Sequence, residues 1–194
     1  MSNWKQILGS EDILIPRLTP EERQKKRLQQ IKNLLLNTHI KEDLDLRNTP
    51  VQDLGNLQSV GGFLDLDNSS IQSLGNLQNV GGYLDLRNTP IQSLGNLQSV
   101  EGYLDLDNSY IQSLGNLQRV GGDLWLDNTP IQDLGNLQSV EGGLWLNSTP
   151  IQSLGNLQRV GGYLDLRNTP ISKLSEIERN KILSKVRVEG EIIF

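Results

Sequence analysis

The chain has no cysteine and no apolar run long enough to cross a bilayer, which takes about 18 residues or more. The lack of cysteine excludes disulfides and thiolate metal ligands. The lack of a long apolar run excludes a transmembrane helix, and the first residues lack the basic start, apolar stretch and cleavage site of a secretory signal. We therefore expect a soluble, cytoplasmic protein with no membrane partner.

Positive charge and catalytic residues are also scarce. The 194 residues include 18 Lys and Arg against 23 Asp and Glu, a formal net charge of −5, so nucleic acid is not expected as a partner. The single histidine, His39, has no second histidine or cysteine to complete a zinc or catalytic set. We expect no enzymatic activity, no cofactor and no metal site, although clustered aspartates leave calcium open as an alternative.

Most of the sequence consists of one repeat, "VGGYLDLRNTPIQSLGNLQS", which recurs with few changes every twenty residues. A fixed period of this length is typical of a solenoid. A Leu-x-Leu pair marks each copy, at residues 44/46, 64/66, 84/86, 104/106, 124/126, 144/146 and 164/166.

Within one copy the spacing of apolar residues changes from two to three. Leu84 and Leu86 alternate as in a strand, whereas Ile91, Leu94 and Leu97 follow at intervals of three, as in turns or 3₁₀-like segments. The glycines of each copy disfavour a helix on the outer side. Each copy is therefore predicted to be one strand and a return path of turns, which bury their apolar residues only when copies stack.

The two ends depart from the repeat and are predicted to cap the stack. Thr19-Pro20-Glu21-Glu22 is typical of a helix start, and apolar residues on one side extend a predicted helix from Pro20 to Leu36 over the first coil. A second helix is predicted from Ser175 to Val186, followed by "VEGEIIF" as an eighth strand with Ile192 and Phe194 in the leucine places. Residues 1–17 are expected either to pack on the cap helix or to form an arm that docks on a partner.

The pattern Leu-x-Leu-x-x-Thr-x-Ile-x-x-Leu-x-x-Leu-x-x-Val resembles the leucine-rich repeat, with Thr89 where that family often has Asn. The "VGGYLDL" linkage is similar to the receptor L-domain branch, and the whole chain resembles predicted repeat proteins of bacteria and phages. The resemblance implies an α/β repeat solenoid, leucine-rich-repeat-like, with a parallel sheet of about eight strands. It divides one folded domain into an arm and helical cap (1–43), seven repeats (44–174) and a helix-plus-strand cap (175–194), and it implies ligand or protein binding without marking a catalytic residue.

Two columns of asparagine are predicted to be structural. Their side-chain amides are expected to satisfy backbone groups of the next coil, as in the asparagine ladder of the resembled family. One column follows the Leu-x-Leu pair, interrupted by Ser148, and the other lies in each "LGN".

Residues that flank the paired leucines are predicted to point away from the core and to form the binding surface. They make an aromatic, an acidic and a mixed column, which suits a cationic partner such as a basic peptide, with cation–π contacts from the tyrosines. The simpler interpretation is a solvated acidic face that keeps sheets from pairing. The candidate binding residues are Tyr83, Asp85, Arg87, Tyr103, Asp105, Asp123, Trp125, Gly143, Trp145, Tyr163 and Asp165.

Trp125 and Trp145 replace aspartate in two adjacent copies, where the flanking residue shrinks to Asp123 and Gly143. Two indoles side by side next to a hollow suit a hot spot of recognition; alternatively, aromatic bulk has only moved over by one column. We expect a monomeric, non-enzymatic module that binds a protein or peptide through its sheet face. The alternatives are a component of a larger assembly anchored by the arm and, third, carbohydrate binding at the two tryptophans.

Overall fold

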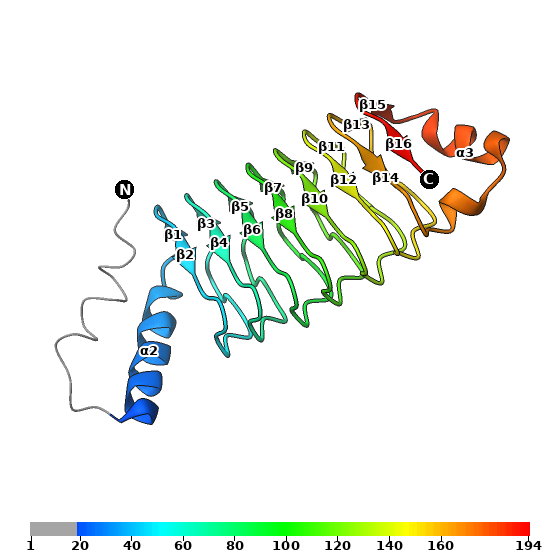
Figure 1. Ribbon diagram of the computed structural model, residues 1–194. Coiled ribbons are helices and arrows are strands. Elements are labelled where there is room, and N and C mark those ends of the chain that lie inside the picture. The colour runs from blue at the N-terminus through cyan, green and yellow to red at the C-terminus, as the bar shows by residue number, and fades with distance from the viewer. Residues whose placement is uncertain (1–18) are drawn as a thin grey trace.

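The computed structural model describes residues 19–194, in which the twenty-residue copies form successive coils of a solenoid (Figure 1). The two interpretations of residues 1–17 concern a segment outside the described residues. A helix caps each end of the stack, α2 at the first coil and α3 at the last. The predicted fold class, a parallel-sheet repeat solenoid with these caps, is confirmed.

Each coil contributes one two-residue strand to each of two eight-stranded parallel sheets. Paired strands lie twenty residues apart, as Asp85 pairs with Asp105, until the last coil, where Leu164 pairs with Ile192 as predicted. The LxL sheet consists of β2 (Leu44–Asp45), β4 (Leu64–Asp65), β6 (Leu84–Asp85), β8 (Leu104–Asp105), β10 (Leu124–Trp125), β12 (Leu144–Trp145), β14 (Leu164–Asp165) and β16 (Ile192–Ile193).

A second sheet, here called the valine sheet, is absent from the expectations above. Only one valine recurs in this segment, which is too little apolar alternation to indicate a strand, yet stacked coils bring every extended segment within pairing distance of its copy. The valine sheet consists of β1 (His39–Ile40), β3 (Ser59–Val60), β5 (Asn79–Val80), β7 (Ser99–Val100), β9 (Arg119–Val120), β11 (Ser139–Val140), β13 (Arg159–Val160) and β15 (Arg187–Val188).

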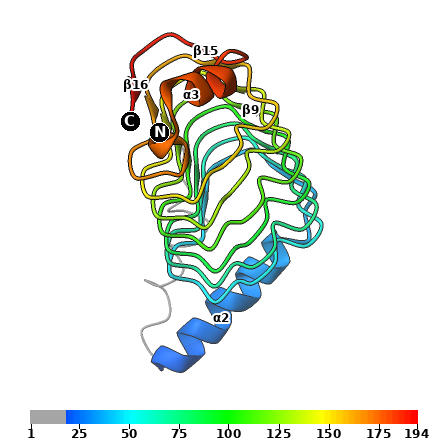
Figure 2. The ribbon, with the colours of Figure 1, turned by 90° about the vertical axis from the view of Figure 1, so that its right-hand side faces the viewer.

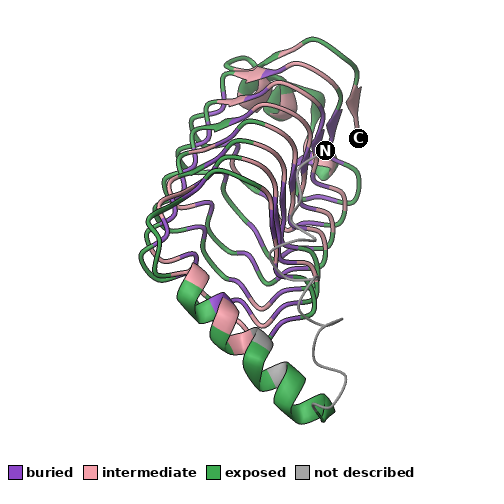
Figure 3. Cartoon of the chain, turned by 90° about the vertical axis from the view of Figure 1, so that its left-hand side faces the viewer, coloured by how far each residue is buried: buried purple, intermediate pink, exposed green. Residues whose placement is uncertain are grey.

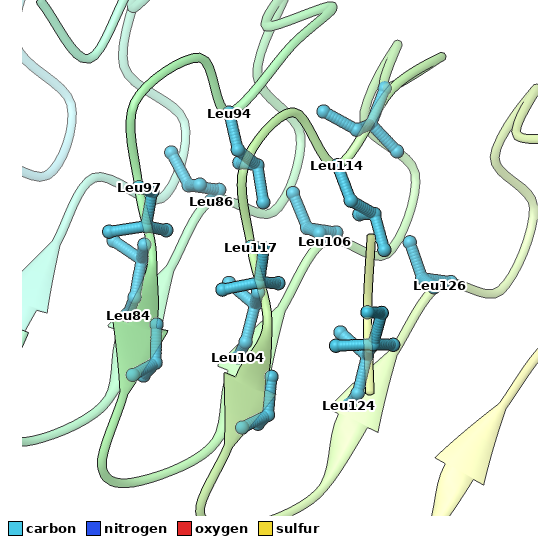
Figure 4. Close-up of a cluster of buried hydrophobic side chains, with 14 of the residues drawn as sticks. Leu84, Leu86, Leu94, Leu97, Leu104, Leu106, Leu114, Leu117, Leu124 and Leu126 are labelled. Carbon is cyan, nitrogen blue, oxygen red and sulfur yellow. The ribbon is translucent and has the colours of Figure 1, made fainter. Parts of the chain in front are cut away.

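The core is a set of aliphatic columns that run the length of the stack. In one coil Leu84, Leu86, Ile91, Leu94 and Leu97 are all fully buried. Figure 4 shows leucines of neighbouring coils packed in the same places, and Figure 3 shows the buried segments lining the inside of the coils. Each such side chain contributes roughly 1.5–3 kcal/mol, and the predicted core positions are confirmed.

The asparagine columns are structural, but partly for a reason that was not predicted. Asparagines after the LxL pair adopt left-handed backbone, for example Asn88 at φ 56°, a conformation that asparagine tolerates better than most residues. In the "LGN" column, Asn136 Nδ2 donates to the carbonyl of Gly115 at 3.1 Å. That carbonyl belongs to the preceding coil, whereas a bond to the next coil was predicted.

The two cap helices begin where the sequence predicts. Helix α2 (Pro20–Leu34) has Thr19 as its N-cap in a capping box with Glu22 and ends two residues before the predicted Leu36. After a short 3₁₀ helix η1 (Ile171–Lys173), helix α3 (Glu176–Leu183) starts from Ser175 in the same way. Figure 2 shows α3 lying across the end of the stack. No helix in residues 19–194 is both long and apolar enough to cross a membrane.

Candidate functional site

The predicted binding residues all lie on the LxL sheet or within two residues of its strands. We call the surface made by the side chains before, between and after the paired leucines the display face. Strand register brings equivalent residues of successive coils side by side, so that Asp85 lies beside Asp105 and Trp125 beside Trp145. The display face is therefore a set of columns, as predicted, but their members interact more closely than the sequence suggested.

The aromatic column is a stack of parallel rings in its first half. The centroids of Phe63 and Tyr83 lie 4.7 Å apart, and those of Tyr83 and Tyr103 lie 4.6 Å apart, with interplanar angles of 4° and 2°. These ring faces cover one another, so the expectation that Tyr83 offers its face to a cation is wrong. Burial, followed by the nearby Asp65 carboxylate, raises the pKa of the Tyr83 phenol to about 12.

Arginines lie across the aspartates in three coils. Arg87 Nη2 binds Asp85 Oδ2 at 2.6 Å, and Arg87 Nε lies 3.3 Å from Asp105 Oδ2 in the next coil. Arg47 bridges Asp45 and Asp65 in the same way.

These bridges bury carboxylates that were expected to be open to solvent. Asp85 is 2% exposed, and Asp165, bound by Arg167 at 2.6 Å, is 0% exposed. Burial alone raises the pKa of Asp165, but the hydrogen bonds and charge of Arg167 outweigh burial and lower it. The simple picture of a solvated acidic column is thus wrong at these positions, because a guanidinium covers each carboxylate.

The same aspartates also accept a backbone hydrogen bond. Asp85 Oδ1 accepts from the N–H of Arg87 at 3.1 Å, and Asp105 Oδ1 accepts from that of Asp107 at 3.1 Å. This bond from the residue two positions on is repeated at Asp45, Asp65 and Asp165.

Tryptophan at positions 125 and 145 removes this acceptor, and the preceding coil replaces it. Asp107 Oδ1 accepts from the N–H of Asp127 at 2.8 Å, and Asp127 Oδ1 accepts from that of Asn147 at 2.8 Å. The two tryptophans and the two aspartates that precede them by eighteen residues therefore belong to one arrangement. Asp107 and Asp127 were not predicted; the available signal was that each carries aspartate, rather than arginine, in the coil before a tryptophan.

Asp107 and Asp127 are two carboxylates that lack a direct ion pair, although the charges of Arg87 and Arg167 act on them from farther away. In residues 19–194 no lysine or arginine makes an ion pair with either carboxylate. Burial, followed by the charge of Asp105, raises the pKa of Asp107 to about 6, and burial also raises the pKa of Asp105 and of Asp127.

The two tryptophans lie side by side in the strand register, as predicted, but their rings contact different partners. Trp125 contacts Tyr103 edge to face, at 5.4 Å and 74°, whereas Trp145 contacts Tyr163 at 6.4 Å and 37°. A Cβ added at Gly143 would lie only 3.0 Å from Trp145 Nε1, so the indole covers the glycine and the predicted hollow is filled.

The tryptophans also differ in which of their groups lack a partner within the described residues. Trp145 Nε1 is buried without a hydrogen-bond partner. Trp125 has no stacked ring among the described neighbours. Beside it, Asp123 Oδ1 accepts from the N–H of Gly143 at 2.6 Å, which ties the two small flanking residues together.

The stack of aromatic rings and the series of arginine–aspartate bridges are interrupted in the same coils. The parallel ring stack ends at Tyr103, and Arg87 is followed by Asp107, Asp127 and Asn147 before the next arginine, Arg167. We call the residues at this interruption, Asp105, Asp107, Trp125 and Asp127, the central patch. In the described part of the chain no group of three or more His, Cys, Asp or Glu residues has a geometry that would hold a metal ion.

A comparison with models of known protein families finds no match, and a comparison with curated proteins finds none. The geometry of the display face is therefore the basis for a functional proposal.

Proposed function

We propose that the protein is a non-enzymatic, leucine-rich-repeat-like module of the cytoplasm that binds a basic segment of a partner protein at the central patch. The observation that carries this proposal is that, within residues 19–194, no arginine makes an ion pair with Asp107 or Asp127, in the same coils in which the ring stack is interrupted. In neighbouring coils an arginine of the chain itself neutralises the carboxylates. A lysine or arginine of a partner would supply the same charge here.

The rest of the display face supports this location. In the first coils the rings of Phe63, Tyr83 and Tyr103 cover one another, and Arg47 and Arg87 occupy the carboxylates, so few groups remain for a partner. Trp125 is the aromatic side chain of the central patch, and no described ring stacks on its indole. Its indole would add apolar contact and a cation–π interaction, which is worth about 0.5–2 kcal/mol.

The proposal is tested with a lysine-rich peptide titrated into the full chain at low salt, with a glutamate-rich peptide of equal length as the probe control. We expect the lysine-rich peptide alone to bind, and D107N/D127N to weaken binding about tenfold or more because two desolvated charges are lost. Both amides keep an oxygen that can accept from the N–H of Asp127 or Asn147. Binding is measured by peptide fluorescence anisotropy.

The matched control is D67N, which makes the same change in the same column of the display face. Asp67 is already occupied by the amides of Asn68 and Asn88, at 2.8 and 3.1 Å, so D67N should bind as the parent does. Equal affinity of the parent and D107N/D127N, or no binding by the parent, would contradict the proposal.

A further inference from the structure

A groove lies at the other end of the molecule from α2, away from the display face, between α3 and the turn of the sixth repeat. It has a volume of about 510 Å³, within the range of ligand and peptide sites. Its floor is apolar and comes from both the repeat and the cap: Leu154, Leu157, Leu174, Ile182 and Val186. We call it the cap groove.

The rim of the cap groove is cationic. Lys181 in the last turn of α3 and Lys185 just beyond the helix both line the groove. Neither makes an ion pair within residues 19–194. The one acidic lining residue, Glu178, is engaged in the helix cap, where its carboxylate accepts from the N–H and Oγ of Ser175 at 2.9 and 2.6 Å, and these bonds lower its pKa.

The chain itself carries a segment of complementary chemistry. Glu11 and Asp12 are followed directly by Ile13, Leu14 and Ile15, so two adjacent acids precede three large aliphatic residues. Acidic side chains match the two lysines of the rim, and the aliphatic residues match the apolar floor. We propose that Glu11 to Ile15 of one molecule bind the cap groove of a second copy of this chain.

The segment cannot reach the groove of its own molecule. Residues 152–157 of the groove lie five repeats from the equivalent turn 52–57 of the first described coils, about 24 Å at one interstrand spacing per coil. Helix α2, with 15 residues, is about 22 Å long and carries Thr19 farther from α3 (Figure 1). Thr19 follows Asp12 by seven residues, which span at most about 25 Å.

The contact joins two different surfaces, so it is heterologous and repeats from copy to copy without closing by itself. Molecules would then line up head to tail, each donating residues 11–15 to the next. This assembly replaces the monomer that the sequence analysis expects. It uses neither the central patch nor its partner, and it stands independently of the proposed function.

The test is the molar mass of the full chain as a function of concentration, measured by sedimentation equilibrium. We expect the mass of the parent to rise with concentration and to fall at higher salt, because the charges at the rim are screened. Both K181E/K185E and E11K/D12K should weaken association at least about tenfold. The control K25E/K41E makes the same charge change on exposed lysines outside the groove and should associate more than K181E/K185E does.

Mixing the two charge-reversed chains separates this contact from general charge effects. K181E/K185E carries an acidic segment and an acidic rim, and E11K/D12K carries a basic segment and a basic rim, so each should be monomeric alone and the mixture should associate. A parent chain that stays monomeric up to its solubility limit overturns the proposal. Association of K181E/K185E equal to that of the parent, or a mixture that stays monomeric, does so as well.

Discussion

The turn after each LxL pair shows how one buried hydroxyl fits a repeated environment. Thr89 Oγ1 donates to the carbonyl of Leu86 at 2.7 Å, and Thr129 Oγ1 donates to that of Leu126 at 2.7 Å. Ser109 stands between them in the same column, but its Oγ is buried and has no hydrogen-bond partner. The missing methyl group lets the serine hydroxyl turn away from the carbonyl that threonine reaches.

We therefore expect S109T to stabilise the protein. Threonine would bury one more methyl group, worth about 0.8 kcal/mol, and would make the hydrogen bond that its neighbours make. The free energy of unfolding, measured by urea denaturation, should rise by about 1 kcal/mol. The reverse change T129S should lower it by a similar amount, and a loss of stability in S109T would refute this reading of the turn.

At the scale of one coil, stacking depends on a glycine in the turn that joins the two sheets. The second glycine of each "GG" or "EG" pair passes so close to the preceding coil that a side chain has no room. A Cβ on Gly102 would lie 2.8 Å from the carbonyl carbon of Gly82, and one on Gly122 would lie 2.9 Å from the backbone nitrogen of Tyr103. These contacts are closer than any real Cβ makes, so neighbouring coils approach only where this residue is glycine.

The substitution G122A should accordingly separate two coils and lower the free energy of unfolding by about 1–3 kcal/mol. Thermal unfolding followed by circular dichroism would record the loss. E101A, in the equivalent turn of the preceding coil, is the control because Glu101 is exposed and should change stability by less than about 0.5 kcal/mol. Equal melting temperatures for the two variants would show that coil spacing tolerates a methyl group here.

For the whole molecule, the raised carboxylate pKa values link stability to pH. The pKa of Asp107 is about 6 in the folded protein, against about 3.9 for an unfolded chain. Between these values the folded state binds more protons than the unfolded state, so stability increases as pH falls from about 6 toward 4. Asp65, Asp105 and Asp127, whose pKa values are also raised, change the stability in the same direction. The pKa of Asp165 is lowered, so its contribution to stability is lost only below about pH 4.

We expect the melting temperature to be higher at pH 5 than at pH 7. The contribution of Asp107, half open to solvent screening, is at most about 1 kcal/mol. D107N removes that titration and keeps an oxygen for the N–H of Asp127, so it should be more stable than the parent at pH 7 and nearly equal to it at pH 4.5. D67N keeps Asp107 and should still melt at a higher temperature at pH 5 than at pH 7; a parent that is less stable at pH 5 than at pH 7 would contradict the argument.

The sequence by itself determined the repeat architecture. The twenty-residue period placed Leu84 and Leu86 in the core, the capping signal at Thr19 located the first terminal helix, and the departure from the repeat after residue 174 located the second. The phase of "VEGEIIF" placed Ile192 in the last strand. These features follow from residue spacing and from contacts between neighbours in sequence, which is why they can be predicted from one chain.

Only the tertiary structure decided how the display face is arranged. The bridge from Arg87 to Asp105, the stacking of Tyr83 on Tyr103 and the cover of Trp145 over Gly143 all depend on rotamers and on the distance between coils. The valine sheet likewise exists because stacking brings weakly patterned segments into register. Side chains twenty residues apart in sequence lie one interstrand spacing apart in the fold. Which of them form hydrogen bonds or ion pairs with one another therefore depends on the tertiary structure, because the repeat pattern fixes only their positions.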